Sequence, residues 1–123
     1  RPAIYSRPMS TLSTILAAVL GVVFAGAAIP KLTGRQKMVD NFARWGLRPE
    51  VLVATGSVEL LAAVLLLVGI AVNALAITGA LLVMFVMTGA LMTHAHAKDP
   101  LVAFIPPAVL LALAVALLVS MLP

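Results

Sequence analysis

The chain has 123 residues, of which 63% are hydrophobic and 10% charged, and its mean hydropathy is +1.20. A soluble domain is about 45–50% apolar and about 25% charged, so this composition excludes a soluble globular protein and indicates an integral membrane protein. The net charge of +4 is concentrated in segment 31–48, which is typical of residues that set membrane topology and contact anionic lipids, and excludes a nucleic-acid-binding protein.

Four apolar runs are long enough to cross a membrane as helices, at residues 12–29, 51–70, 74–93 and 101–122. At 1.5 Å per residue, runs of about 18–22 residues span about 27–33 Å, which matches a hydrocarbon core of about 30 Å. The alternation typical of barrel strands is absent, so we predict an all-α membrane four-helix bundle that forms a single transmembrane domain over residues 1–123. A cleaved leader is an alternative for the first run, but that run is long for a leader and three more spans follow.

Two further patterns concern how the spans begin and pack. Pro106 and Pro107 predict either that the fourth helix begins near Pro106, with 101–105 as an entry segment, or that it is kinked there. Small residues recur at helical spacing in three runs, and we expect the faces that carry them to turn inward. These residues are Ala17, Gly21, Ala25 and Ala28; Thr55, Gly56, Ala62 and Ala63; and Ala108, Ala112, Ala116 and Ser120.

The segment 36–45, between the first two runs, has the pattern of a short amphipathic helix on the membrane surface. Met38, Phe42 and Trp45 share one face, while Asp40 and Arg44 form an i,i+4 pair on the other. We expect Phe42 and Trp45 to anchor this helix at the membrane interface, where tryptophan is enriched. A merely solvated loop is the alternative.

The loops before the second and fourth runs lie on the same side of the membrane and carry six of the eight Lys and Arg residues. The positive-inside rule places these two loops in the cytoplasm and both termini outside. We expect the membrane to be the bacterial cytoplasmic membrane.

Glu59 lies near the middle of the second apolar run, where an ionised group costs about 2.5–3.5 kcal/mol on insertion scales. We therefore expect it to face a partner or a cavity. Thr55, one turn earlier, could donate a hydrogen bond to the carboxyl group, and Lys31 is the nearest candidate cation. Lys31 either points down into the bundle towards Glu59 or extends its ammonium group to the lipid headgroups. Glu59 itself either makes a structural helix–helix contact or handles a ligand, cofactor or proton.

His94 and His96 lie on the loop side, at the end of the third run. Their i,i+2 spacing places them on different faces of a helix, and no cysteine or third histidine completes a zinc site, so we predict no metal site. No nucleophile–base pair is visible, and we predict no catalytic residues.

The sequence resembles the DoxX-like family of small four-helix membrane proteins. Residues 25–32 (AGAAIPKL) are similar to the family's small-residue helix end followed by a lysine, although Pro30 departs from the pattern. Residues 42–49 (FARWGLRP) resemble its short loop that leads to a glycine and a proline. Residues 56–61 (GSVELL), continuing to Gly69, resemble its second helix with an acidic residue inside the membrane.

The resemblance implies an association with membrane redox systems, which include a subunit of a quinol-oxidising complex. Lys31 and Glu59 are the positions onto which the family pattern maps. We therefore expect a non-catalytic integral-membrane subunit of a larger complex, quinone-linked or respiratory, that contacts lipids and other membrane subunits. We expect no intrinsic cofactor; a quinone or lipid would be bound together with a partner. The alternative is a small proton, quinone or lipid carrier that uses Glu59.

Overall fold

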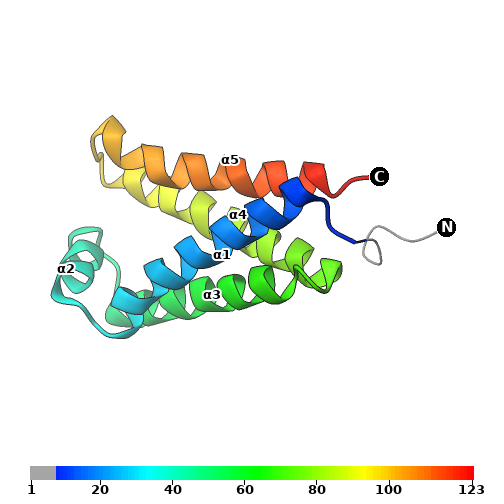
Figure 1. Ribbon diagram of the computed structural model, residues 1–123. Helices are drawn as coiled ribbons and strands as arrows, with labels where there is room; N and C mark the ends of the chain where they lie inside the picture. Colours follow the sequence, from blue (N-terminus) through cyan, green and yellow to red (C-terminus); the bar gives the residue numbers. More distant parts are fainter. Residues whose placement is uncertain (1–7) are drawn as a thin grey trace.

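The computed structural model describes residues 8–123 and contains five α-helices and one short 3-10 helix in that part of the chain. The long helices are α1 (Thr11–Leu32), α3 (Pro49–Val68), α4 (Asn73–His96) and α5 (Ile105–Ser120). The short elements are α2 (Gln36–Arg44) and η2 (Leu101–Phe104). Figure 1 shows the long helices running side by side along the molecule, with α2 at the end opposite the start of α1 and the C-terminus.

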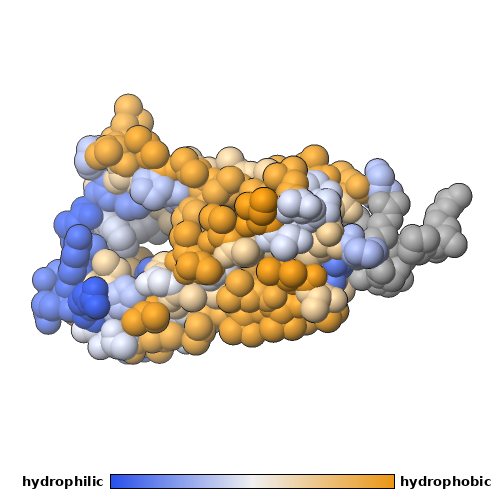
Figure 2. Space-filling model, viewed as in Figure 1, coloured by the Kyte–Doolittle hydropathy of each residue, from blue (hydrophilic) through white to orange (hydrophobic). Residues whose placement is uncertain are grey.

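Four segments are long and apolar enough to cross a membrane: α1, α3, α4, and η2 together with α5. Their outward faces carry large apolar side chains, which is the arrangement that lipid requires. Figure 2 shows this apolar surface along the length of the helices and a hydrophilic end around α2. The predicted helical membrane bundle with a short amphipathic helix between the first two spans is confirmed.

The first span continues beyond the predicted end at residue 29, through Pro30 to Leu32. A proline lacks only one backbone hydrogen bond in the final turn of a helix. Thr33 then closes the helix by donating its backbone N–H to the Ile29 carbonyl oxygen at 2.9 Å, and Gly34 follows at φ +68°, a conformation that favours glycine. The extension places Lys31 on a helix instead of in a loop.

The helix of the fourth span begins near Pro106, which was one of the two predicted alternatives, and is not a longer helix kinked at that point. α5 starts at Ile105 with Pro106 and Pro107 in its first turn, where no helical hydrogen bond needs their missing N–H groups. The entry segment forms the 3-10 helix η2.

The core is formed by small residues of α1, α3 and α4 with a few large side chains between them, including Leu20, Phe24 and Leu66. Ala17, Gly21 and Ala28 of α1 are buried, as are Gly56, Ala62 and Ala63 of α3, so these two stripes turn inward as predicted. The chain also packs closely at the turn between α3 and α4, because a Cβ on Gly69 would lie 2.3 Å from the Ala76 nitrogen.

The prediction for the small residues of the fourth span was right for Ser120, whose hydroxyl lies 2.7 Å from that of Ser13 on α1, and wrong for the three alanines. Ala108, Ala112 and Ala116 are exposed, while the opposite face of α5 is buried through Ala114 and Leu117. α5 contacts α4 and α1, and its long leucine side chains fill the space between those two helices. Alanines are too short to do this, so the alanine face turns outward.

Candidate functional site

Lys31 and Glu59 form an ion pair inside the bundle, between the last turn of α1 and the middle of α3. Lys31 Nζ lies 2.9 Å from Glu59 Oε1 and also donates a hydrogen bond to the Ala27 carbonyl oxygen at 3.2 Å. The Glu59 side chain is 4% exposed and that of Lys31 15%. The lysine therefore points into the bundle, and its charge compensates a carboxylate that would otherwise be unpaired among apolar side chains.

Gly56 makes room for this contact. It lies one turn before Glu59 on the same face of α3, and a Cβ at that position would lie 3.0 Å from both Lys31 Cβ and Leu32 Cγ. The absence of a side chain therefore allows the end of α1 to approach α3 closely enough for the ion pair to form.

The contact at Glu59 Oε1 is mainly electrostatic. Glu59 Oε1 has no partner with hydrogen-bond geometry, so charge attraction to Lys31 is the main interaction at this atom. Thr55 donates its hydroxyl to the Val51 carbonyl oxygen at 2.7 Å and is thus engaged within its own helix. The arrangement holds α1 against α3.

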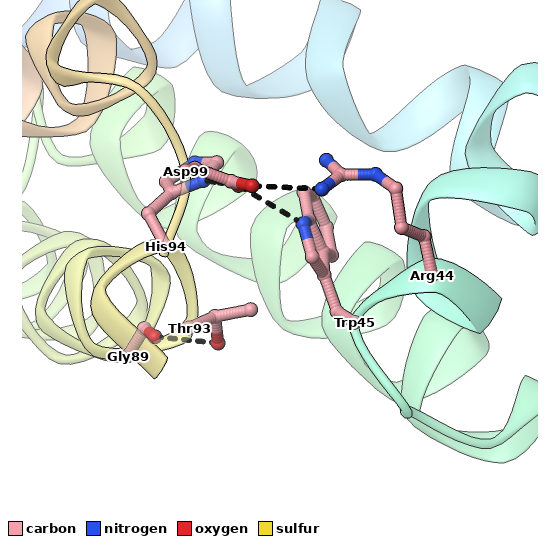
Figure 3. A network of polar contacts seen from close by, with 6 residues as sticks. All are labelled: Arg44, Trp45, Gly89, Thr93, His94 and Asp99. Carbon is pink, nitrogen blue, oxygen red and sulfur yellow. Dashed lines mark hydrogen bonds and ion pairs between the residues drawn. The ribbon is translucent and has the colours of Figure 1, made fainter. Parts of the chain in front are cut away.

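A second polar cluster joins α2 to the loop after α4 (Figure 3). Asp99 accepts a hydrogen bond from Arg44 at 2.7 Å on Oδ1, and Oδ2 is contacted by Trp45 Nε1 at 3.2 Å and by His94 Nδ1 at 2.7 Å. These contacts, chiefly the Arg44 guanidinium and then His94, lower the pKa of Asp99 to about 2. Arg44, Trp45, His94 and Asp99 are called the Asp99 cluster below.

Aromatic rings surround this cluster and pack in sequence. The ring centroids of Phe42 and Trp45 are 5.2 Å apart, those of Trp45 and His94 5.3 Å, and those of His94 and Phe104 5.7 Å. Phe42 is buried, so this series of rings fixes the end of α2 against the end of α4 and against η2. That Phe42 and Trp45 also anchor the membrane interface stays a prediction.

The family model for the DoxX-like family matches residues 15–117. The chain belongs to the DoxX-like family. The matched span contains both members of the ion pair and the whole Asp99 cluster, so both sites lie within the part that defines this DoxX-like protein. No curated protein and no solved structure matches the chain.

The sequence patterns did not single out Asp99, and they assigned a different partner to Arg44. Asp40 was expected to pair with Arg44, but its Oδ1 instead accepts a hydrogen bond from Gln36 Nε2 at 2.7 Å, while Arg44 reaches across to Asp99. Asp99 satisfies three donors at once and is only 5% exposed in its side chain, which makes it the better partner. The sequence offered one signal for this contact: Asp99 is the only acidic residue of the loop after α4, and that loop lies on the same side of the bundle as the basic loop.

The two histidines of this DoxX-like protein have different environments. His94 belongs to the Asp99 cluster, whereas His96, the last residue of α4, is exposed. The histidines therefore do not converge on one ligand.

Proposed function

We propose that this DoxX-like protein is a non-catalytic subunit of a larger membrane complex and that it packs the alanine face of α5 against a helix of a partner. The alanine face comprises Ala108, Ala112 and Ala116. Its exposure is the observation that carries the proposal.

Lipid provides no hydrophobic force that brings helices together, so close association depends on small residues that let two backbones approach. α5 turns its leucines inward, and its outward face carries the three alanines beside the exposed Ile105, Val109, Val115 and Val119. A partner backbone can approach α5 closely along the alanines. In addition, 17% of the most apolar part of this span is buried, against 33% in both α1 and α3. A partner helix on α5 would give this span the burial that the other spans obtain within the chain.

The ion pair favours a subunit over a carrier. A carrier would use Glu59 to bind its cargo, but here the carboxylate is held by Lys31 and is almost fully buried. The family's association with membrane redox systems makes a quinone-linked complex the first one to test.

The test is purification of the full chain from its native membrane in mild detergent, followed by native mass spectrometry. We expect the chain to co-purify with at least one other membrane protein. Ala112→Leu should release that partner, because the larger side chain blocks close helix approach. Ala54→Leu, the same substitution at an exposed position of α3, should leave the complex intact. A stable monomer would contradict the proposal, and a complex made only of copies of this chain would replace it with self-association.

A further inference from the structure

An open cleft of about 620 Å³ lies beside the Asp99 cluster, between α2 and the start of α5. Its volume is in the range of small-molecule binding sites. Figure 2 shows the hollow at the hydrophilic end of the molecule, next to an apolar projection formed where α5 begins. Neither the ion pair nor the alanine face of α5 contributes to it.

One wall of the cleft is cationic. Lys37, Asn41 and Arg44 line it from α2, and their i, i+4, i+7 spacing places them on one face of that helix. Lys37 is exposed, and no carboxylate in the described part of the chain, residues 8–123, forms an ion pair with it. Arg44 contacts Asp99 through one terminal nitrogen, and its side chain is 55% exposed. Asp99 also lines the cleft and its charge is balanced by Arg44, so Lys37 supplies the excess positive charge of this wall.

The opposite wall is apolar. Pro106 and Pro107 line it and offer no backbone N–H, and Ala103 completes it. Just outside the cleft, Leu101 and Val102 are 85% and 67% exposed. A ligand that fits both walls carries an anionic group for α2 and an apolar chain for the start of α5.

We propose that this cleft binds the phosphate headgroup of an anionic phospholipid, with the phosphate against Lys37 and Arg44 and an acyl chain along the start of α5. Basic pockets at the ends of membrane helices have this selectivity for anionic headgroups. The guanidinium of Arg44 suits phosphate because it offers several N–H donors in one plane, and Lys37 adds a point charge. The cleft lies at the end of the spanning helices, which is the level of the headgroups.

The single tryptophan, Trp45, lines the cleft and provides the probe. The full chain is reconstituted into phosphatidylcholine vesicles that contain a minority of phosphatidylglycerol with brominated acyl chains, and quenching of Trp45 is compared with that by brominated phosphatidylcholine. We expect selective quenching by the anionic lipid. Lys37→Gln should reduce that selectivity about fivefold, because one basic contact is lost. Lys98→Gln is the matched control, since Lys98 is an exposed lysine at the same end that does not line the cleft.

Equal quenching by both lipids in the wild type would overturn the proposal, as would an equal loss of selectivity in the two variants, which would indicate diffuse charge attraction. A further arm adds soluble glycerol phosphate at constant ionic strength. If it abolishes the selectivity at a concentration no higher than that of the anionic lipid, the acyl chain adds nothing to binding and the assignment to lipid is wrong. Persistence of the selectivity supports the lipid. An unchanged far-UV circular dichroism spectrum of Lys37→Gln shows that the variant is folded.

Discussion

The Lys31–Glu59 pair and the Asp99 cluster use similar charged groups, but they lie in different surroundings. The pair lies between two membrane-spanning helices and has one cation for one carboxylate. The cluster lies at the polar end, where three donors surround Asp99 and the Arg44 side chain reaches water. A charge removed from the first site leaves its partner in an apolar interior, whereas at the second site water and neighbouring donors compensate.

The comparison indicates that the two sites have different tasks. The pair is an all-or-none contact that holds α1 against α3. The Asp99 cluster positions α2, and we expect that loosening it leaves the bundle folded. Variants at the two sites should therefore differ in the size of the effect and in what they change.

Removal of the buried cation should have the largest effect. Lys31→Met leaves Glu59 without its counter-charge, and we expect the free energy of unfolding to fall by about 3–5 kcal/mol. Unfolding by SDS in mixed micelles, followed by circular dichroism, measures this loss. The double variant Lys31→Met/Glu59→Leu should recover most of it, since an apolar pair of similar volume needs no compensation.

The exposed ion pair between Arg48 and Glu50 provides the control for that experiment. Its side chains are 83% and 73% exposed, so Arg48→Met should leave the unfolding curve unchanged. If Lys31→Met and Arg48→Met behaved alike, the distinction between buried and exposed pairs would fail.

A smaller effect is expected when the close approach of α1 and α3 is disturbed. In Gly56→Ala the new Cβ would press on Lys31 and Leu32, and we expect a loss of about 1–3 kcal/mol in the same unfolding assay. Gly26→Ala is the matched control, because no atom lies within 4 Å of its Cβ position. The control should be stabilised by about 0.5–1 kcal/mol, since alanine favours a helix. A stabilised Gly56→Ala variant would show that the helices are not in close contact there.

The smallest effect is a change at α2 with pH. Because the pKa of Asp99 is about 2 in the folded chain and lies below its ordinary value of 3.8, the ionised cluster stabilises the docked α2 above about pH 4. This contribution is lost as the pH falls from about 4 to about 2 and the carboxyl group takes up a proton. Trp45 loses its charged acceptor in that range, so its fluorescence should change while the helical circular dichroism stays constant.

Asp99→Asn tests whether the fluorescence change arises from Asp99. The variant carries no acid at the cluster and should show no fluorescence transition in the same range. A transition of equal size in the variant, or a wild-type midpoint at an ordinary aspartate value, would contradict the assigned contacts.

Much of the fold follows from the sequence, because length and hydropathy alone define which segments can cross a membrane. The end of α1 differed, because Pro30 removes one backbone hydrogen bond but does not prevent the helix from continuing to Leu32. The predicted orientation of the alanine face of α5 was wrong for a more general reason. A stripe of small residues predicts close packing, but it does not specify whether the neighbour belongs to the same chain or to another one.

The two sites also differ in how far the sequence predicts them. The cost of a carboxylate in lipid pointed to Glu59, and the helix ends brought Lys31 near it, so burial and connectivity were sufficient to propose the contact. Asp99 gives no such signal, because a polar residue in a short loop is unremarkable by itself. Two of its partners, Arg44 at the end of α2 and Trp45 directly after it, lie 55 and 54 residues earlier in the chain, and only tertiary packing brings them to Asp99.

The contact between Lys31 and Glu59 can be measured directly in a membrane. Solid-state NMR can measure the dipolar coupling between the 15Nζ of lysine and the 13Cδ of glutamate in lipid bilayers, with Glu50→Gln leaving Glu59 as the only labelled glutamate. We predict strong dephasing, as expected for an Nζ–Oε1 distance of 2.9 Å, and its disappearance in Lys31→Met. Absence of dephasing in the folded chain, with the lysine signal that of a headgroup-exposed ammonium, would contradict the account.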